Sequence, residues 1–409
     1  MNTKKKVPII RIKGFNDDWE RRKLGELVKF SKGTGYSKGD LKEFGTPIIL
    51  YGRLYTNYET VIKDVDTFVD AKNGSVYSCG GEVIIPASGE TAEDISVASV
   101  VGKPGILLGG DLNIITPPSE IDSAFLALSI SNGKPHNEMA KMAQGKSIVH
   151  LHNSDLEKIE LAYPSYEEQV QISTYFGYLD HLITLHQREI DRIVCLRKAM
   201  VEKMFPQNGA DVPAVRFSRY KEPWRLCQFS EIFTERHIID TISDEYPQLA
   251  FTIEEGVIRP EDKKTNKRDF LIIDKATKKY LQTEYDDIIY NPANVIYGAI
   301  HRNALGKGCV SPIYKIFYTD QDSTFMECIV RHPNFIKEIS RSMEGTVKKL
   351  RTLKAKAFLE MSAYIAPTIE EQRQIGEYFR QMDRLIEIEK EELEKIKHIK
   401  SACLEKMFV

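Results

Sequence analysis

The sequence lacks the features that would place this chain in a membrane, outside the cell or around a metal ion. No run of about eighteen apolar residues occurs, so we expect no transmembrane helix. The basic start MNTKKKVPII is not followed by an apolar stretch, which argues against a signal peptide. The six cysteines are scattered, with no CxxC pair and no Cys/His cluster at zinc spacing. We therefore expect reduced thiols in a cytoplasm and no metal site.

An excess of positive charge is also missing. The 57 Lys and Arg residues are balanced by 59 Asp and Glu residues, so the formal net charge is −2. The chain as a whole is not a polycation, and any contact with nucleic acid must come from local basic patches. At 409 residues the chain is longer than one that usually folds around a single hydrophobic core. We therefore expect two or three domains.

Signatures of catalysis are missing as well. The segment GKS at 145–147 ends like a phosphate-binding loop, but Ala140 stands where the upstream glycine is required. The segment YNPA at 290–293 is superficially similar to the Asn-Pro-Pro-aromatic motif of adenine methyltransferases, but it lacks the second proline and the aromatic residue. No GxSxG elbow occurs, and we find no clustered carboxylates suited to magnesium. We expect no catalytic residue in this chain.

One long segment of the sequence occurs twice. Residues 167–205 and 370–408 align without a gap at an offset of 203, and 17 of the 39 positions are identical. Chance would give only a few identities, so the repeat indicates duplication.

A second, weaker repeat marks the segment that leads into each half. RIKGFNDDWERRKLGEL contains Arg11 and Trp19, and RFSRYKEPWRLCQFSEI contains Arg216 and Trp224 at an offset of 205. The bodies that follow, about residues 29–160 and 232–363, look unrelated to each other in sequence. We therefore predict a domain, a long helix, a second domain and a second long helix, over residues 1–164, 165–206, 207–366 and 367–409.

Both repeated segments have the pattern of long helices. Each follows a proline, with Ser165 or Thr368 as the expected N-cap and a pair of glutamates in the first turn, where the helix dipole favours negative charge. Apolar residues alternate at spacings of four and three, which is typical of a heptad seam. The residues expected to pack helix against helix are Ile172, Phe176, Leu179, Ile183, Ile190, Ile193, Ile375, Phe379, Met382, Ile386, Leu393 and Ile396.

Polar residues interrupt both seams at the same two places, His186/Glu389 and Arg197/Lys400. Such residues cost stability but can fix the register of a helix pair. In an antiparallel pair we expect His186 near Lys400 or Arg197 near Glu389, and only the second pairing has opposite charges. The alternative is that these side chains extend to solvent.

An antiparallel pair of such helices has a consequence for function. At 1.5 Å per residue, 39 helical residues reach about 58 Å, which would hold the two bodies apart and relate the halves by an approximate two-fold axis. Bodies placed in this way could read two half-sites on DNA with centres about 34–36 Å apart. Because the bodies differ, the half-sites should differ, and the expected target is bipartite and asymmetric.

With these features together, the sequence resembles a known family, the specificity subunits of type I restriction–modification systems. PSYEEQVQI and PTIEEQRQI are similar to the family's repeated helical region, and GKSIVHLHNSDLEKIELAYP at 145–164 resembles the closing stretch of a recognition domain. The second copy of that stretch, at 344–367, differs from it in the spacing and identity of its residues. The resemblance covers nearly the whole chain.

The resemblance implies a bacterial, cytoplasmic subunit of α/β class, with two mixed target-recognition domains and two long antiparallel helices. It implies double-stranded DNA as a partner, two methyltransferase subunits that carry S-adenosylmethionine and methylate adenine, and restriction subunits that use ATP and magnesium. No cofactor, no metal and no membrane contact is expected for this chain itself. The helices would bind the methyltransferase subunits, and some of their apolar residues lie off the seam, at Leu182, Leu185, Leu385 and Ile388.

Candidate DNA-binding residues in the first body lie in polar loops. The glycine-containing loop at 31–38 lets a duplex approach the backbone, and two further candidates follow the apolar strands PIILY and EVIIP. The competing interpretation of each is a solvated surface loop. The residues expected to touch DNA are Lys32, Thr34, Tyr36, Lys38, Tyr51, Arg53, Ser88 and Thr91.

In the second body, residues 259–279 are dense in basic side chains, which suits phosphates but also suits a solvated face. The segment after the apolar run VIYGAI is the preferred base-reading segment, because Arg can bridge guanine and Asn can bridge adenine. The residues expected to touch DNA here are Arg259, Lys263, Lys267, Arg268, His301, Arg302, Asn303 and Lys307. The rival functions are a stand-alone enzyme and a coiled-coil interaction scaffold that does not bind DNA.

Overall fold

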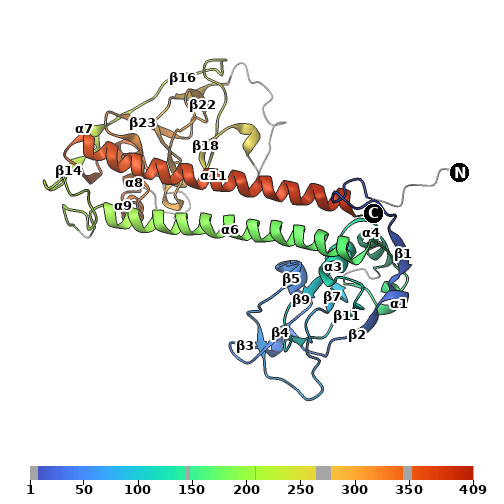
Figure 1. Ribbon diagram of the computed structural model, residues 1–409. Coiled ribbons are helices and arrows are strands. Elements are labelled where there is room, and N and C mark those ends of the chain that lie inside the picture. Colours follow the sequence, from blue (N-terminus) through green and yellow to red (C-terminus); the bar gives the residue numbers. More distant parts are fainter. Residues whose placement is uncertain (1–7, 144–147, 208, 264–277, 344–351, 409) are drawn as a thin grey trace. The chain divides into compact units, whose positions relative to one another are not determined.

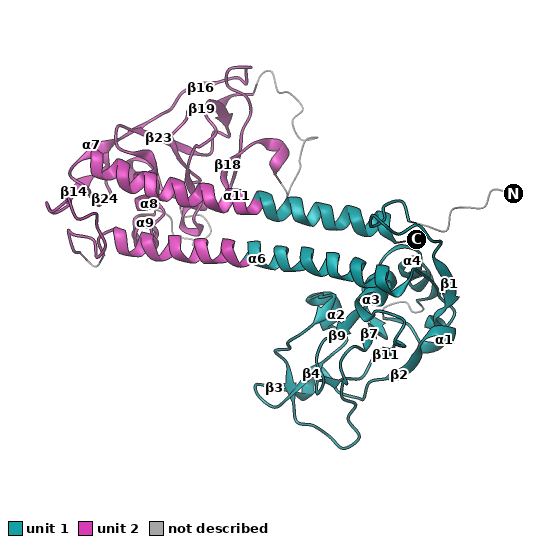
Figure 2. Ribbon diagram, in the orientation of Figure 1, with its two compact units in different colours: residues 1–187, 391–409 teal, residues 188–390 magenta. Residues whose placement is uncertain are grey.

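The computed structural model describes residues 8–143, 148–207, 209–263, 278–343 and 352–408. The chain forms two compact units, shown in different colours in Figure 2. The first unit comprises residues 1–187 and 391–409, and the second comprises residues 188–390. Each long helix therefore contributes one half to each unit, a division that differs from the four consecutive parts expected from the sequence.

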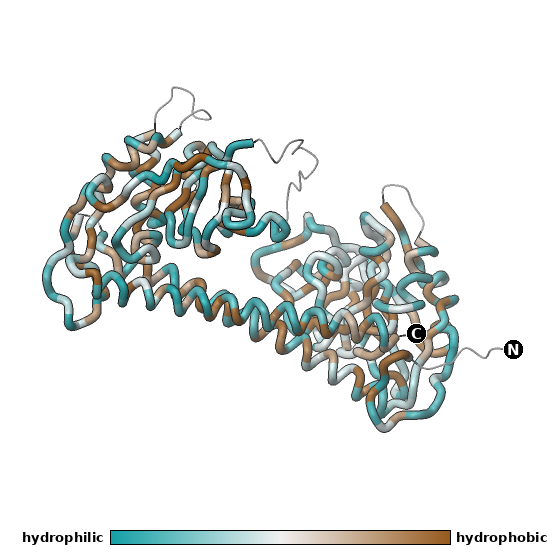
Figure 3. Tube along the Cα trace, turned by 90° about the horizontal axis from the view of Figure 1, so that it is seen from above, coloured by the Kyte–Doolittle hydropathy of each residue, from teal (hydrophilic) through white to brown (hydrophobic). Residues whose placement is uncertain are grey.

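The two long helices are α6 (Tyr166–Met204) and α11 (Ile369–Met407), each of 39 residues (Figure 1). Both begin as the sequence predicts. The Ser165 hydroxyl accepts a hydrogen bond from the Glu168 amide at 3.4 Å, and the Thr368 hydroxyl accepts one from the Glu371 amide at 3.3 Å. Hydrophobic and hydrophilic residues alternate along the helix that ends at the C-terminus (Figure 3), as expected for a helix with one buried face.

Within each unit, one half of α6 packs antiparallel against one half of α11 through the predicted seam. In the first unit the Tyr175 hydroxyl lies 3.7 Å from the Cys403 sulfur, and Phe176 packs in one cluster with Met407. In the second unit Ile193 shares a cluster with Phe379. Ten seam residues are buried and two, Ile183 and Ile396, are half-buried; the buried ones are Ile172, Phe176, Leu179, Ile190, Ile193, Ile375, Phe379, Met382, Ile386 and Leu393.

The polar seam residues pair with carboxylates that the sequence analysis did not select. Arg197 donates two hydrogen bonds to Asp383, at 2.5 and 3.0 Å, and Lys400 pairs with Asp180. The two pairs occupy equivalent positions of the repeat, one in each unit. The expected pairing of Arg197 with Glu389 or His186 with Lys400 is corrected, because Asp383 and Asp180 already hold the two cations.

The first body is built on a five-stranded sheet rich in Val and Ile, as strands favour. Its order is β2 (Lys29–Lys32), β11 (Leu112–Thr116), β7 (Val83–Pro86), β9 (Ser99–Val101) and β5 (Val61–Ile62). The first four strands pair antiparallel, and β5 is parallel to β9. A smaller sheet has the order β10 (Leu107–Leu108), β4 (Thr46–Ile49), β6 (Phe68–Val69) and β3 (Leu41–Lys42).

Helices and short strand pairs complete the first body. Strand β11, between β2 and β7, leads into α3 (Ser123–Ser131) and α4 (Gly133–Met142). An antiparallel pair of β1 (Glu20–Lys23) and β13 (Glu160–Tyr163) joins the start of the body to its end. The remaining short elements are α1 (Leu24–Leu27), η1 (Lys38–Asp40), α2 (Arg53–Thr56), β8 (Ser88–Gly89), β12 (Val149–His150) and α5 (Asn153–Leu156).

The second body has a main sheet of the order β15 (Phe233–Glu235), β23 (Lys315–Thr319), β20 (Ile288–Tyr290) and β21 (Ile300–Arg302), all antiparallel. Here β23 leads into α8 (Ser323–Val330) and α9 (Pro333–Ser342). The pair β14 (Arg225–Gln228) and β24 (Ser362–Ile365) joins start to end. The other elements are α7 (Phe229–Ile232), β16 (Ile239–Asp240), β17 (Ala250–Thr252), β18 (Gly256–Ile258), η2 (Pro260–Asp262), β19 (Tyr280–Thr283), η4 (Val295–Tyr297), β22 (Gly308–Val310) and α10 (Ala355–Leu359).

The two bodies share one topology, although their sequences look unrelated. The order β2-β11-β7-β9 of the first body corresponds strand by strand to β15-β23-β20-β21 of the second. The correspondence extends to single hydrogen bonds, since the Leu151 amide donates to the Ala87 carbonyl at 3.0 Å and the Leu353 amide donates to the Pro292 carbonyl at 3.0 Å. The duplication therefore includes the four-stranded core of the bodies as well as the helices.

In each body the core lies between the main sheet and the helix pair that follows β11 or β23. In the first body Ile85 and Ile115 of the sheet cluster with Leu126 and Met139 of the helices. In the second body aromatic residues take these places, with the Phe317 ring 4.7 Å from that of Phe358 and 5.9 Å from that of Tyr290. Equal backbones filled with different side chains explain why the sequence shows no relation between the bodies.

Candidate nucleic-acid interface

A buried ion pair fixes the leading segment of each half to the first turn of its long helix. The Arg11 guanidinium contacts both carboxylate oxygens of Glu168 at 2.7 Å. The Arg216 guanidinium contacts those of Glu371 at 2.6 and 2.8 Å, and the Trp224 indole also donates to Glu371 at 3.3 Å. These bidentate pairs position the body on its helix. The two arginines occupy matching places in the repeated leading segments, but the repeat alone did not predict a role for them.

A glutamine next to each glutamate anchors the same turn to the body. The Gln169 side-chain oxygen accepts from the Asp122 amide at 2.9 Å, and Gln372 accepts from the Asp322 amide at 3.2 Å. Each aspartate is in turn the N-cap of the helix that follows, α3 or α8. The repeated EEQ motif is therefore a docking point for the body, and not only a favourable first turn.

The main sheet of each body has two ends that differ in their surroundings. We call the end at which β11 or β23 leads into the helix pair the helix end, and the opposite end the loop end. The helix end comprises residues 78–82, 102–105 and 116–122 in the first body and 284–287, 303–307 and 319–322 in the second. The loop end comprises residues 33–36, 87–98 and 110–111 in the first body and 236–238, 291–299 and 311–314 in the second.

The first loop of candidate residues in the first body is only partly available to a ligand. Lys32 and Lys38 are exposed. Thr34 is half-buried, and its hydroxyl accepts from the Val76 amide at 3.3 Å. Tyr36 is buried, with its hydroxyl 2.5 Å from that of Ser75. The structure thus leaves the two lysines as candidates for phosphate contacts and gives Tyr36 a structural position, contrary to its expected exposure.

The other candidates of the first body differ in how far they are available to a ligand. Tyr51 is half-buried, and Arg53 is tied to Glu59 at 2.8 Å and Asp66 at 2.9 Å. Ser88 is buried, with its hydroxyl 3.0 Å from Nδ1 of His150, whereas Thr91 is exposed. The expected exposure of Ser88 is corrected by its pairing with β12.

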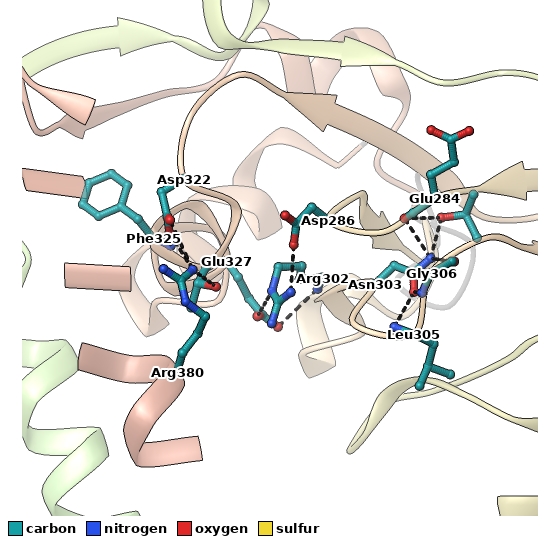
Figure 4. A network of polar contacts seen from close by, with 12 residues as sticks. Glu284, Asp286, Arg302, Asn303, Leu305, Gly306, Asp322, Phe325, Glu327 and Arg380 are labelled. Carbon is teal, nitrogen blue, oxygen red and sulfur yellow. Dashed lines mark hydrogen bonds and ion pairs between the residues drawn. The ribbon is translucent and has the colours of Figure 1, made fainter. Parts of the chain in front are cut away.

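In the second body, the preferred base-reading residues His301 and Arg302 are engaged inside the protein, and Figure 4 shows the contacts of Arg302. His301 is 3% exposed and donates through Nε2 to the Ile253 carbonyl at 2.8 Å. Burial, with the nearby Arg331, lowers the pKa of His301 to about 4. Arg302 is paired with Asp286 at 2.8 Å and with Glu327 at 3.5 Å. These contacts do not support the expectation that either side chain faces a base.

Asn303 is a structural residue of the loop that follows β21. Its side chain is fully buried, and Nδ2 donates to the carbonyls of Glu284 at 2.9 Å and Gly306 at 2.7 Å. Its Oδ1 accepts from the Leu305 amide at 3.0 Å. The expected contact with adenine is corrected, because these backbone groups occupy the amide. Lys307 is exposed and forms an ion pair with Glu245.

The basic run of the second body is described only at its start. Arg259 is exposed and Lys263 is half-buried, on either side of η2. Lys267 and Arg268 lie outside the described residues, as does the GKS segment at 145–147. Asp286 has a φ of 74° and lies in a turn that precedes the buried strand β20, which begins at Ile288.

Some exposed polar residues at or beside the loop ends were not predicted from the sequence as candidates for DNA contact. In the first body, His150 and His152 stand on alternate positions of one segment, with parallel rings 6.5 Å apart. In the second body, Tyr297 is 67% exposed and precedes Gly298, which has a φ of 89°. The alternating VHLHN pattern was the signal for the histidines. No signal in one sequence distinguishes an exposed tyrosine after VI from a buried one.

Within the described part of the chain, no group of three or more His, Cys, Asp and Glu side chains is arranged to hold a metal ion. None of the helices described there has the length and hydropathy needed for a membrane span.

Comparisons with known proteins identify the relatives of this sequence. Residues 16–194 match the family model described as the type I restriction modification DNA specificity domain. The chain is 22% identical over 411 residues to the type I restriction enzyme MjaVIII specificity subunit of Methanocaldococcus jannaschii, with 95% of this chain and 91% of that protein covered. The putative type I restriction enzyme MjaX specificity subunit of the same organism is 23% identical over 404 residues, with 95% and 92% covered.

Two solved structures share the fold. The type I restriction–modification system S subunit from M. genitalium matches with a TM-score of 0.63 and 16% identity, over 98% of this chain and 99% of that chain. A chain from a study of complex assembly and conformational transition of the type I R-M system matches with a TM-score of 0.50 and 16% identity, over 94% and 96%. The mixed α/β fold with two domains and two long helices, predicted from sequence, is confirmed.

Proposed function

Because this chain belongs to the family of type I restriction–modification DNA-specificity subunits, we propose that it recognises a bipartite, asymmetric DNA site and docks methyltransferase subunits. One body would read each half-site. The chain itself would catalyse nothing. S-adenosylmethionine would be held by the methyltransferase subunits, which methylate adenine, and ATP and magnesium by restriction subunits that join through them.

The observation that carries this proposal is the pair of bodies with one topology and different loops. The strand order is the same in both main sheets. The loop-end connections differ, because residues 87–98 join β7 to β9 through β8, whereas residues 291–299 join β20 to β21 through η4. Base edges are read by side chains at defined positions, so equal scaffolds with unequal loops suit two different half-sites.

Docking of two identical subunits is supported by exposed apolar residues at equivalent positions of the long helices. Leu185 is 44% exposed and its equivalent Ile388 is 45% exposed. Leu196 is 47% exposed and its equivalent Ile399 is 49% exposed. Leu385, another predicted off-seam residue, is 51% exposed, and Leu182 is half-buried. A partner that buries such apolar residues on one helix could bury the equivalent residues on the other helix in the same way.

The experiment that tests the proposal is methylation mapping by long-read sequencing. Cells carry this chain with and without its cognate methyltransferase subunit. We expect a bipartite, asymmetric motif to gain N6-methyladenine only when both proteins are present. Exchange of residues 232–363 for the corresponding body of a relative should change one half-site and leave the other. Methylation of the same motif without this chain would contradict a recognition role.

The rival function is a helical interaction scaffold without a DNA role. The exposed apolar residues of the helices suit a scaffold equally well. The two functions differ in the salt dependence of DNA affinity, because contacts with phosphates release counterions and a scaffold makes none. An assembled complex whose affinity for DNA does not change with salt would favour the scaffold.

A further inference from the structure

The shared topology reveals a conflict between the DNA contacts expected in the two bodies. The candidate loops of the first body, around Lys32 and Ser88, lie at or beside the loop end of the main sheet. In the second body, Arg302 ends β21 at the helix end, and Lys307 follows it. Bodies that arose by duplication and kept one topology are expected to meet a common ligand with the same end, so one of the two assignments is incorrect.

The helix end is already occupied by the protein in both bodies. Gln169 and Gln372, in the first turns of α6 and α11, bind the backbone amides that begin α3 and α8. Gln169 Nε2 also donates to the Glu120 carbonyl at 3.3 Å. The long helix of each unit therefore packs against the end from which a duplex would have to approach.

The charge at the helix end of the second body also opposes DNA (Figure 4). Arg302 is neutralised there by Asp286 and Glu327, which lie at 2.8 and 3.5 Å. Lys307 pairs with Glu245, and Arg236 pairs with Glu284 at 3.3 Å and Asp287 at 2.8 Å. Breaking these pairs to free the cations for phosphates would cost their interaction energy.

The loop end carries exposed side chains that suit a duplex in both bodies. In the first body Lys32 is exposed at the end of β2, and exposed His150 is held in place by the Ser88 hydroxyl at 3.0 Å. In the second body Tyr297 is 67% exposed between β20 and β21. Lys354 is exposed directly after Leu353, whose amide binds the Pro292 carbonyl of the same connection at 3.0 Å.

We propose that both bodies meet DNA with the loop end of the main sheet, so that Tyr297 and Lys354 in the second body correspond in role to His150 and Lys32 in the first. This inference rests on the proposed DNA-reading function and specifies its surface. The lysines would contact phosphates. Tyr297 and His150 would reach base edges or the sugar–phosphate backbone and contribute to the choice of half-site.

Four exposed lysines give a matched test. Lys32→Ala and Lys354→Ala change the loop ends, and Lys103→Ala and Lys307→Ala change the helix ends of the same bodies. Each variant is assembled with the methyltransferase subunit, and affinity for a duplex that carries the mapped motif is measured across salt concentrations by fluorescence anisotropy. We expect each loop-end variant to flatten the log–log salt slope by about 0.9. The helix-end variants should keep the wild-type slope.

The outcomes separate this inference from the proposed function. If wild-type complex binds the motif with a steep salt slope and only the helix-end variants flatten it, or none of the four does, the loop-end assignment is overturned. If the wild-type complex has no salt-dependent affinity for the motif, the proposed function fails instead.

A second measurement tests the choice of half-site. With Tyr297→Ala, methylation mapping should show less methylation at sites that carry the wild-type motif. The half of the motif that the second body reads should become less specific. The first half should remain unchanged. His150→Ala should do the reverse. Variants that leave both halves of the motif and the extent of methylation unchanged would contradict the roles given to these two side chains.

Discussion

At the scale of single residues, buried His301 acts as a neutral hydrogen-bond donor whose protonation opposes folding. Burial and Arg331 lower its pKa to about 4, below the ordinary value of about 6.5. The unfolded chain therefore takes up a proton at a higher pH than the folded chain. The contribution of His301 to stability is complete above about pH 6.5 and is lost as the pH falls toward 4. Glu327 Oε1, 3.9 Å from Nδ1, offsets only part of the effect.

We expect His301 to lower the free energy of unfolding of the second unit by roughly 2 kcal/mol between pH 7 and pH 5. His301→Gln should remove this part of the pH dependence, because glutamine does not titrate. Urea unfolding of both proteins at the two pH values, in a Trp19→Phe background so that Trp224 reports on the second unit, measures the difference. An equal change with pH in the two proteins would show that His301 does not titrate as proposed.

Substitution by alanine should have opposite effects on stability at Gly177 in α6 and at Gly376 in α11. No atom lies within 4 Å of the place where a Cβ on Gly177 would stand, whereas a Cβ on Gly376 would lie 2.0 Å from Oδ1 of Asp322. Gly177→Ala should stabilise the protein by about 1 kcal/mol through helix propensity. Gly376→Ala should destabilise it by about 1 kcal/mol, because Asp322 caps α8 and the loss of the cap outweighs the propensity gain. Chemical denaturation measures both, and stabilisation by both would contradict the close approach.

At the scale of elements, we expect each body to depend on its own buried arginine–glutamate pair. We call the pairs Arg11–Glu168 and Arg216–Glu371 the clamps of the first and second bodies. Glu371 is fully buried, and its partner Arg216 has a side chain 8% exposed. Arg216→Ala leaves a buried carboxylate without its cation and should cost about 3–5 kcal/mol. Arg11→Ala should cost somewhat less, because its side chain is 14% exposed.

Single-tryptophan backgrounds locate these losses. Unfolding followed through Trp224 should shift to lower urea with Arg216→Ala, and unfolding followed through Trp19 should shift with Arg11→Ala. The exposed ion pair between Arg225 and Glu231, with side chains 73% and 50% exposed, offers a control. Arg225→Ala should change stability by less than about 1 kcal/mol, and a comparable loss in all three variants would argue against a special role for the clamps.

The helices could be predicted from the sequence because their periodicity is local, but their polar partners could not. Seam residues such as Ile172 and Phe379 follow from spacing along one chain segment. The partners Asp180 and Asp383 depend on the relative register of two helices, and a heptad pattern does not fix the register of an antiparallel pair. Asp180 and Asp383 are identical in the two copies of the repeat, but this identity does not predict that Asp180 pairs with Lys400 and Asp383 with Arg197.

The equivalence of the two sheets could not be predicted, because it resides in long-range pairing. A strand such as β7 is visible in the sequence as a short apolar run. The order of the sheet could not be predicted, because it depends on pairing such as that of β11 with β2, some eighty residues away in sequence. Ile85 and Tyr290 can occupy matching places in two cores only because the neighbouring side chains changed with them. Loop residues met a similar limit, since Asn303 and Arg302 have side chains suited to DNA but are engaged by protein groups that only the fold brings near.

At the scale of the whole molecule, the duplication predicts that partners bind in twos. Leu185 on α6 and Ile388 on α11 occupy equivalent positions of the repeat and are about equally exposed, at 44% and 45%. Leu185→Glu or Ile388→Glu places a charge on one of the two proposed docking surfaces. Because both side chains are exposed, each substitution should change stability by less than about 0.5 kcal/mol, and the effect on assembly can be interpreted separately from folding.

If the two surfaces are independent copies of one docking site, either variant should bind one methyltransferase subunit in place of two, and the double variant should bind none. Native mass spectrometry of the complexes gives these ratios directly. Ser401→Glu on α11, at another exposed position, controls for added charge and should keep both subunits. A single variant that loses both subunits would mean that the methyltransferases bind cooperatively or across both helices at once. A double variant that still binds two would place the docking surface elsewhere on the chain.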